Sequence, residues 1–372
     1  MNMPFGSFDW ICRHAPLPQC NLFFAQLYNG DPPYLTNLFP NSSDFFSTYD
    51  VTSSSARGDN NVLAAAGDAG TGVGANCEIP HVGHRGSIGD VALIVLSVLS
   101  LIFALVLTYL ANRRAAAVGR IELKFLLVAF AAHSALQIVT MSSLLPQGST
   151  ALSVLSAIHV ALYVGLFWLL LGNALVSLQL IEDGTISALV PLTGIFILLF
   201  APTLYISLDT SMSWTSAFRF SPTTAPEVRA TALFVLTLIW PALAAVAFFA
   251  IMLYVSFVML KEVKPALMYI LAFVLFLGGG IIFFLASEPL CNASNQKVNG
   301  AFLSTLLSAG ALGAIYYAWM ASLTSCSFLD DFLSEKRLGD QLIFSGYYGG
   351  RLGRRSINLN ILHPPVPYFS VS

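Results

Sequence analysis

The stretch VALIVLSVLSLIFALVLTYLA, residues 91–111, decides the fold class of this chain. It holds no Asp, Glu, Lys or Arg. It also matches the run of about 20 apolar residues that a helix needs to cross the hydrocarbon core of a bilayer. We therefore predict that residues 91–111 form a transmembrane helix.

The rest of the chain repeats this pattern. Of its 372 residues, 56% are hydrophobic and 10% are charged, whereas a soluble domain carries roughly 25% charged residues. Most of the surface should therefore face lipid, and the net charge of −2 gives no reason to expect a nucleic acid as partner. We predict an all-α polytopic membrane protein with seven transmembrane helices. Six further stretches complete the set, with Lys124 as their one charged residue: residues 123–145, 151–181, 186–208, 230–260, 266–287 and 301–323.

Segments of different composition flank the predicted bundle at residues 91–323. Residues 1–90 begin with the compact stretch FGSFDWICRHAPLPQC (5–20) and continue through a small, polar stretch at 52–74 that is typical of a flexible linker. Residues 1–30 lack the basic start and unbroken apolar run of a signal peptide, so the first spanning helix should itself target the chain to the membrane. Residues 324–372 are expected to form a mostly disordered tail.

Lysine and arginine predict the orientation, because both favour the cytosolic side. If the C-terminus is cytosolic, eleven of them lie inside: Arg113, Arg114, Arg120, Lys124, Lys261, Lys264, Lys336, Arg337, Arg351, Arg354 and Arg355. Six lie outside: Arg13, Arg57, Arg85, Arg219, Arg229 and Lys297. We therefore predict a luminal N-terminus and a cytosolic C-terminus.

Cysteines and glycosylation sequons agree with this orientation. The two sequons, at Asn41 and Asn292, fall on the predicted luminal side, and Cys326 at the inner end of the last helix is expected to be a free thiol. Disulfides persist outside the cytosol. Four cysteines fall there: Cys12, Cys20, Cys77 and Cys291. They allow three pairings, and we favour Cys12–Cys20, which closes the opening stretch, with Cys77–Cys291. The result would be a small disulfide-braced luminal cap.

A metal site is the alternative for one of these cysteines. Cys77, His81 and His84 have the spacing C-x3-H-x2-H, and His14 could supply a fourth ligand. A disulfide is the better interpretation of Cys77 in an oxidising compartment. We therefore predict no metal and no cofactor.

A few polar side chains lie inside the predicted spans. Apart from cysteine and tyrosine, His133 and His159 are the ionisable side chains well inside the spans. Gln137 lies one turn from His133, and Asn173 lies further along the third span. An ionisable group in a membrane is by default a functional candidate. Neutral polar side chains also commonly hydrogen-bond neighbouring helices. Because no span offers an acidic partner, a proton relay is disfavoured, and we interpret these four residues as structural. Their neutral donors and acceptors could also cover polar groups on the spans of a partner protein.

Small residues cluster in the last two spans and can let another helix approach closely. Packing inside the bundle explains them, and a contact surface for another membrane protein is the alternative. The residues are Gly278, Gly279, Gly280, Ala309, Gly310, Gly313 and Ala314.

The loop QLIEDGTIS, residues 179–187, connects two predicted spans on the cytosolic side. Gly184 suits the turn and Thr185 can cap the following helix. Glu182 and Asp183 are an acidic pair on a face that is otherwise basic. These residues could select a partner, or the loop could be only a tight connection.

Catalytic motifs are missing from the sequence. It has no HExxH, G-x-S-x-G or phosphate-binding loop. An intramembrane hydrolase or an ion-coupled carrier would need carboxylates within the spans, and the predicted spans have none. We therefore predict that the protein is not an enzyme.

Five segments together resemble the fungal chitin synthase export chaperones, in the same order and at equivalent points of a seven-helix plan. The resemblance covers roughly residues 5–20 and 75–332. The segments are FGSFDWICRHAPLPQC (5–20), AVGRIEL (117–123), LQLIEDGT (178–185), CNASNQKVNG (291–300) and YYAWMASLTSCSFLDDF (316–332).

The resemblance implies a multi-pass protein of the endoplasmic reticulum membrane that helps a chitin synthase fold and leave for the cell surface. The client would be a chitin synthase, held by helix contacts within the membrane, and cell-wall chitin synthesis would depend on it. Vesicle-coat export machinery could bind the cytosolic face, and the protein could accompany its client to the plasma membrane. The alternative class is a seven-helix receptor or a lipid-translocating protein, which shares the same membrane plan.

Overall fold

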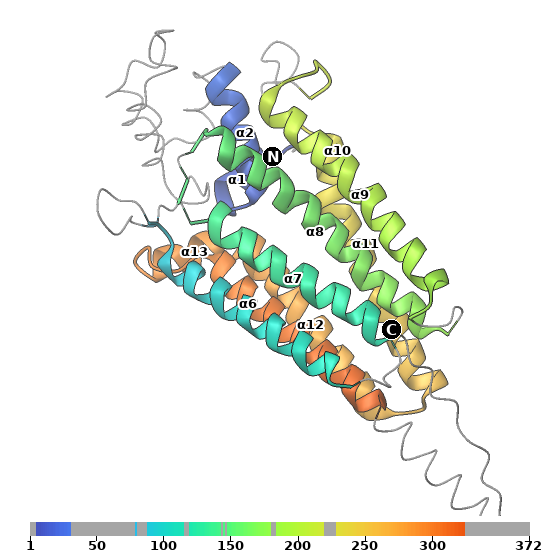
Figure 1. Cartoon of the computed structure of the whole chain (residues 1–372). Coiled ribbons are helices and arrows are strands. Elements are labelled where there is room, and N and C mark those ends of the chain that lie inside the picture. Colours follow the sequence, from blue (N-terminus) through green and yellow to red (C-terminus); the bar gives the residue numbers. More distant parts are fainter. Residues whose placement is uncertain are drawn as a thin grey trace, which may run out of the picture. The chain divides into compact units, whose positions relative to one another are not determined.

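The computed structural model describes residues 5–30, 79, 88–114, 119–142, 144–145, 147–179, 184–218 and 228–323 (Figure 1). Within these ranges seven helices are long and apolar enough to cross a membrane, which confirms the predicted number of spans. The fifth span is built from two α-helical and two π-helical pieces, α10 (Thr231–Phe234), η4 (Val235–Ile239), α11 (Trp240–Tyr254) and η5 (Val255–Met259). The other spans are α6 (Val91–Asn112), α7 (Arg120–Thr140), α8 (Thr150–Ser177), α9 (Ile186–Met212), α12 (Val263–Leu285) and the last helix, Gly300–Leu323.

Three spans carry more charge than the sequence predicted. Helix α7 begins at Arg120 and includes Glu122, because Gly119 takes a left-handed conformation (φ +69°) just before the helix starts. Helix α9 continues to Met212 and therefore includes Asp209. Helix α12 begins at Val263 and includes Lys264. The prediction that Lys124 is the one charged residue of the spans was wrong for these helices. It failed because a helix can extend past its apolar stretch when polar residues fall in its terminal turns.

Helix α8 is the centre of the bundle and packs against α7, α9 and α11. Val160, Ala161 and Val164 on α8 are fully buried. Gly165 lets α9 approach so closely that a Cβ atom there would lie 2.5 Å from Cε2 of Phe196. This closeness fixes α9 against α8, although most of the apolar surface of α9 is exposed.

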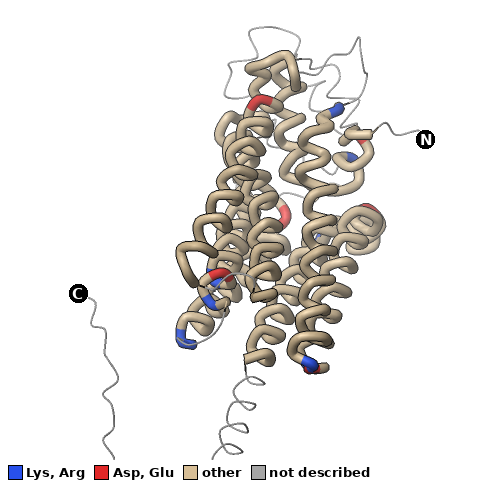
Figure 2. Tube along the Cα trace, turned by 90° about the vertical axis from the view of Figure 1, so that its right-hand side faces the viewer, with Lys and Arg blue, Asp and Glu red and all other residues tan. Residues whose placement is uncertain are grey.

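Charged side chains mark the two ends of the bundle. Among the described residues, Lys, Arg, Asp and Glu lie in the end turns of helices and in connections. Figure 2 shows the basic positions toward the two ends of the tube, with an acidic position about midway between them. One end, where α6 and η5 stop and α7 and α12 start, carries six basic residues: Arg113, Arg114, Arg120, Lys124, Lys261 and Lys264. The other end carries Arg13, Arg229 and Lys297. This distribution is the one used to predict a cytosolic C-terminus, and the orientation remains a prediction.

The N-terminal residues form two short helices, α1 (Asp9–His14) and α2 (Pro18–Gly30), joined by a disulfide between Cys12 and Cys20. We call residues 5–30 the N-terminal module. Helix α2 packs on α8 and α9, and Leu22 and Phe23 are at most 1% exposed. The module is therefore part of the hydrophobic core and is not a separate surface cap.

Candidate functional site

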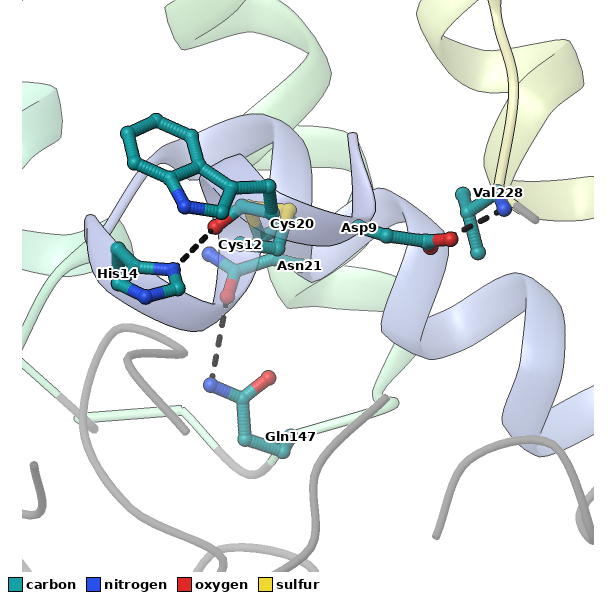
Figure 3. The surroundings of a disulfide bond; sticks show 8 residues. Asp9, Cys12, His14, Cys20, Asn21, Gln147 and Val228 are labelled. Atoms are coloured by element: carbon teal, nitrogen blue, oxygen red, sulfur yellow. Dashed lines mark hydrogen bonds between the residues drawn. A yellow bond between two sulfur atoms is a disulfide. The ribbon is translucent and has the colours of Figure 1, made fainter. Parts of the chain in front are cut away.

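Backbone hydrogen bonds attach the N-terminal module to the segment before α10. The N–H of Phe8 donates to the carbonyl of Val228 at 2.9 Å, and the N–H of Ala230 donates to the carbonyl of Gly6 at 3.1 Å. Oδ1 of Asp9 accepts from the N–H of Val228 at 3.1 Å (Figure 3). The start of the chain is thus joined to a segment that lies more than half the chain away.

Asn21 is the module's polar contact with the bundle. Its Nδ2 donates to the carbonyl of Thr140 at 3.0 Å and to Oγ of Ser156 at 3.1 Å. Its Oδ1 accepts from Nε2 of Gln147 at 3.3 Å, and Figure 3 shows these two side chains pointing toward one another below the disulfide. Asn21 is 1% exposed. One amide therefore contacts the end of α7, the α7–α8 connection and α8.

The two intramembrane histidines continue this network. Nδ1 of His159 lies 2.8 Å from Oγ1 of Thr140, and Nε2 of His159 lies 2.9 Å from Nδ1 of His133. Gln137, one turn from His133, donates from Nε2 to Oγ1 of Thr305 on the last helix at 2.8 Å. These bonds run between helices α7, α8 and the last helix. They are the kind of contact expected of polar side chains that hold a membrane bundle together.

Asp90 and Asn299 cap the N-termini of α6 and the last helix and also bind each other. Oδ1 of Asp90 accepts from the N–H of Leu93 at 3.2 Å, and Oδ2 accepts from Nδ2 of Asn299 at 2.7 Å. Oδ1 of Asn299 accepts from the N–H of Phe302 at 3.1 Å. Burial raises the pKa of Asp90 from 3.8 to about 6, although both hydrogen bonds act in the opposite direction.

The segment CNASNQKVNG (291–300) forms the connection between α13 (Ser287–Ala293) and the last helix. Gly300 lies so close to α13 that a Cβ atom there would be 2.8 Å from Cα of Ser287. Oγ of Ser294 donates a hydrogen bond to the carbonyl of Val298 and accepts one from the N–H of Val298. His14 on α1 reaches the same region, with Nε2 3.4 Å from a carboxylate oxygen of Glu288. Asn292 is exposed on α13, and its glycosylation remains a prediction.

Cys291 is disulfide-bonded in the structure. Cys12 and Cys20 are bonded to each other. The favoured partner of Cys291, Cys77, lies outside the described residues. The pairing Cys77–Cys291 therefore remains a prediction.

At the opposite end, Glu122 joins α7 to the connection between α8 and α9. Its Oε1 accepts from the N–H of Gly184 at 2.9 Å, and its carbonyl accepts from Nδ2 of Asn173 at 3.2 Å. Gly184 has the left-handed backbone of the predicted turn, with φ +67°. Thr185 occupies the N-cap position of α9, but its hydroxyl hydrogen-bonds Oγ of Ser187 and does not cap a backbone N–H. Thr185 is thus the N-cap residue that the sequence indicated, without a hydrogen bond from its side chain to the backbone of the helix.

The small residues of the last two spans divide between internal and exposed positions. Gly279 is buried against the last helix, where a Cβ atom would lie 3.5 Å from the carbonyl oxygen of Ser304. A Cβ atom on Gly313 would lie 3.0 Å from Cζ of Phe103 on α6. By contrast, a Cβ atom on Gly280 would meet nothing within 4 Å, and Gly310 is exposed. Gly278 and Ala309 are half-buried, and Ala314 is buried.

Several predicted residues lie outside the described ranges, and their roles remain predictions. They are Asn41, Cys77, His81, His84, Glu182, Asp183 and Cys326. Among the residues that are described, no three His, Cys, Asp or Glu side chains lie close enough to hold a metal ion.

Sequence reasoning missed the polar residues that tie the bundle together at its ends. A signal existed for two of them, because Asp90 directly precedes an apolar run and Glu122 falls in the first turn of a helix, both common N-terminal positions for acidic residues. Nothing in the sequence distinguished Asn21, whose partners lie more than a hundred residues away along the chain.

Comparison with known proteins identifies the family. The sequence profile described as chitin synthase export chaperone matches residues 4–326. The chain therefore belongs to the chitin synthase export chaperone family. No solved structure gives a significant match to it.

Three curated proteins with the same name illustrate the similarity. The chitin synthase export chaperone of Saccharomyces cerevisiae is 22% identical over 93% of this chain and 100% of its own length. The one from Yarrowia lipolytica is 23% identical over 85% of this chain and 84% of its own. The one from Candida glabrata is 24% identical over 64% of this chain and 74% of its own. The similarity thus extends across the N-terminal module and the whole bundle.

Proposed function

We propose that this protein is a membrane chaperone that helps a chitin synthase fold and leave the endoplasmic reticulum. The observation that carries the proposal is the family match over residues 4–326, which includes the module and all seven spans. The relatives that share this length are named for chitin synthase export. The role we assign is not catalytic, and cell-wall chitin synthesis would depend on it through the client.

The client is held by helix contacts within the membrane. A chitin synthase has many spans, and polar groups on spans that have not yet assembled are costly in lipid. On the chaperone, His133, Gln137, His159 and Asn173 are already hydrogen-bonded within the bundle. We therefore assign those four residues to holding the chaperone together.

We assign the client contact to two small residues, Gly280 on α12 and Gly310 on the last helix. Gly280 has open space beside it and Gly310 is exposed, so a client helix can approach the backbone closely there. Membrane hydrogen bonds average about 0.6 kcal/mol each, so many weak contacts must add up and release remains possible. On the cytosolic side, the segment Glu182–Thr185 would register the pair or recruit export machinery.

The first experiment removes the protein from its native cells and follows a tagged chitin synthase. We expect the synthase to accumulate in the endoplasmic reticulum and cell-wall chitin to fall. If synthase traffic and chitin are normal without the protein, the chaperone proposal fails. The receptor and lipid-translocating alternatives would then be tested.

A second experiment locates the client contact by co-purification. The variant Gly280→Leu should reduce the amount of synthase recovered with the chaperone while leaving the chaperone itself monodisperse. The matched control is Gly194→Leu, because Gly194 also lies on a span and also has no atom within 4 Å of a Cβ position. Equal loss in both variants would argue against a contact surface centred on α12.

A further inference from the structure

The N-terminal module inserts one polar side chain between two spans. Asn21 directly follows Cys20 on α2 and is 1% exposed, and its neighbours Leu22 and Phe23 are equally buried. A buried amide is stable only when its donors and acceptor are satisfied. The three bonds of Asn21 go to Thr140 on α7, to Gln147 and to Ser156 on α8.

The direction of hydrogen bonding can be followed from Thr140 into the bundle. The hydroxyl of Thr140 donates its one proton to the carbonyl of Leu136 at 2.9 Å. Oγ1 must therefore accept from Nδ1–H of His159, 2.8 Å away. With that proton on Nδ1, Nε2 of a neutral His159 accepts from Nδ1–H of His133 at 2.9 Å. Both rings thus take the Nδ1–H form, and the orientation of the pair depends on where Thr140 is held.

The disulfide lies directly beside Asn21 in the chain. Cys20 is the residue before Asn21, and its bond to Cys12 ties the first turn of α2 to α1. Helix α1 is itself attached to the segment before α10 through Asp9 and Val228. Asn21 is therefore connected to α1 through the Cys12–Cys20 bond, and α1 is connected through Asp9 to Val228.

We propose that Asn21 is a positioning residue that fixes the end of α7 to α8, and that the Cys12–Cys20 bond holds it in place. The module then acts as an internal clamp on the α7–α8 pair. This role concerns the chain's own bundle and does not depend on whether the client is a chitin synthase.

The test measures amide hydrogen exchange in the full chain in lipid nanodiscs. Asn21→Leu keeps the number and branching of the side-chain heavy atoms and removes all three bonds. We expect exchange at residues 137–140 and 150–156 to rise about tenfold, with no change at residues 120–127 at the other end of α7. The matched control is Asn29→Leu on the same helix, because Asn29 is exposed and its Nδ2 donates within α2 to the carbonyl of Ala25. This control should leave exchange unchanged.

A double-mutant cycle tests the role of the disulfide. Replacing Cys12 and Cys20 by Ala should raise exchange at the same residues, and adding this change to Asn21→Leu should have little further effect there. Equal, additive increases in the two backgrounds would show that the disulfide acts by another route and would overturn the proposal. Wild-type exchange in Asn21→Leu would overturn it as well.

A spectroscopic measurement tests the proposal even if Asn21→Leu does not fold. Asn21→Asp keeps the size of the side chain and an acceptor for Gln147. It donates no hydrogen bond as a carboxylate and at most one as a carboxylic acid, so it cannot donate to both Thr140 and Ser156. In ¹⁵N-histidine spectra of the wild-type chain, His133 and His159 should both appear in the Nδ1–H form, and Asn21→Asp should shift the His159 signals. A wild-type His159 in the Nε2–H form, or one insensitive to Asn21→Asp, would contradict the proposed connection.

Discussion

The carboxylate of Glu122 accepts a hydrogen bond from the backbone N–H of Gly184 at 2.9 Å, across 62 residues of sequence. Glu122 is fully buried, and its neighbour Ile121 lies within 3.3 Å of where a Cβ atom on Gly184 would stand. The segments AVGRIEL and LQLIEDGT, which the sequence presents far apart, therefore meet at this bond. It holds Gly184, just before α9, against the first turn of α7.

Removing this acceptor should destabilise the protein. Glu122→Ala removes the acceptor of the Gly184 N–H, and because Gly184 is exposed and water can take the acceptor's place, the loss should be close to the net value of one hydrogen bond, about 0.5–1.5 kcal/mol. Glu122→Gln keeps an oxygen at the same place and should stay close to the wild-type protein. The measurement is the thermal unfolding midpoint of each purified variant in detergent. If Glu122→Gln is as unstable as Glu122→Ala, the hydrogen bond to Gly184 is not the reason that Glu122 matters.

The number of spans could be predicted from the sequence because lipid imposes a simple requirement on composition and length. Residues 91–111 satisfy it without reference to any other part of the chain. Helix ends were harder, since Glu122 and Asp209 lie within helices only because of local turns and partners. Their inclusion depends on three-dimensional contacts that hydropathy does not encode.

The site could be predicted only in part for the same reason. Gly279 and Gly280 are neighbouring residues of the same type. Gly279 is buried against the last helix, whereas a Cβ atom on Gly280 would have open space around it. Asn21 lies in a stretch whose cysteines were noticed, but its importance comes from α2 packing on α8. Which residue faces which neighbour is set by the packing of whole helices and not by a local pattern.

Gly300 and Gly280 should respond oppositely to the same substitution. Gly300→Ala places a Cβ atom 2.8 Å from Cα and Cβ of Ser287, and a forced backbone shift of this kind typically costs 1–3 kcal/mol. Gly280→Ala meets no atom within 4 Å and should be neutral or stabilising by up to about 1 kcal/mol, because alanine favours a helix over glycine. Thermal unfolding of both variants under one condition checks the difference. A stable Gly300→Ala protein would mean that α13 can move away from the last helix.

Asp90 should make stability depend on pH. Burial raises its pKa from 3.8 to about 6 in the folded protein. The folded state therefore binds the proton more tightly than the unfolded state, and this contribution to stability is full below pH 3.8 and is lost as pH rises through 6. The difference of about two pKa units corresponds to at most about 3 kcal/mol.

The variant Asp90→Asn isolates this effect, because asparagine does not titrate and can still accept from the N–H of Leu93. We expect the wild-type protein to lose stability relative to Asp90→Asn as the pH is raised from 4 to 7. The measurement is the unfolding midpoint of both proteins across that range. Parallel pH profiles would show that Asp90 does not carry the pH dependence.

Cys291 should be linked to the N-terminal tail. It is disulfide-bonded, Cys12 and Cys20 are bonded to each other, and Cys77 is the remaining cysteine on the predicted luminal side. Non-reducing peptide mapping should therefore recover Cys291 joined to a peptide that contains Cys77. Closing so long a loop stabilises by roughly 3–5 kcal/mol in the chain-entropy model.

Cys291→Ala should accordingly lower the unfolding midpoint without reductant and have little effect with it. Cys326→Ala is the control, because Cys326 is predicted to be a free cytosolic thiol. A bond between Cys291 and Cys326 would place both on one side of the membrane, and the predicted orientation of the last helix would then be wrong.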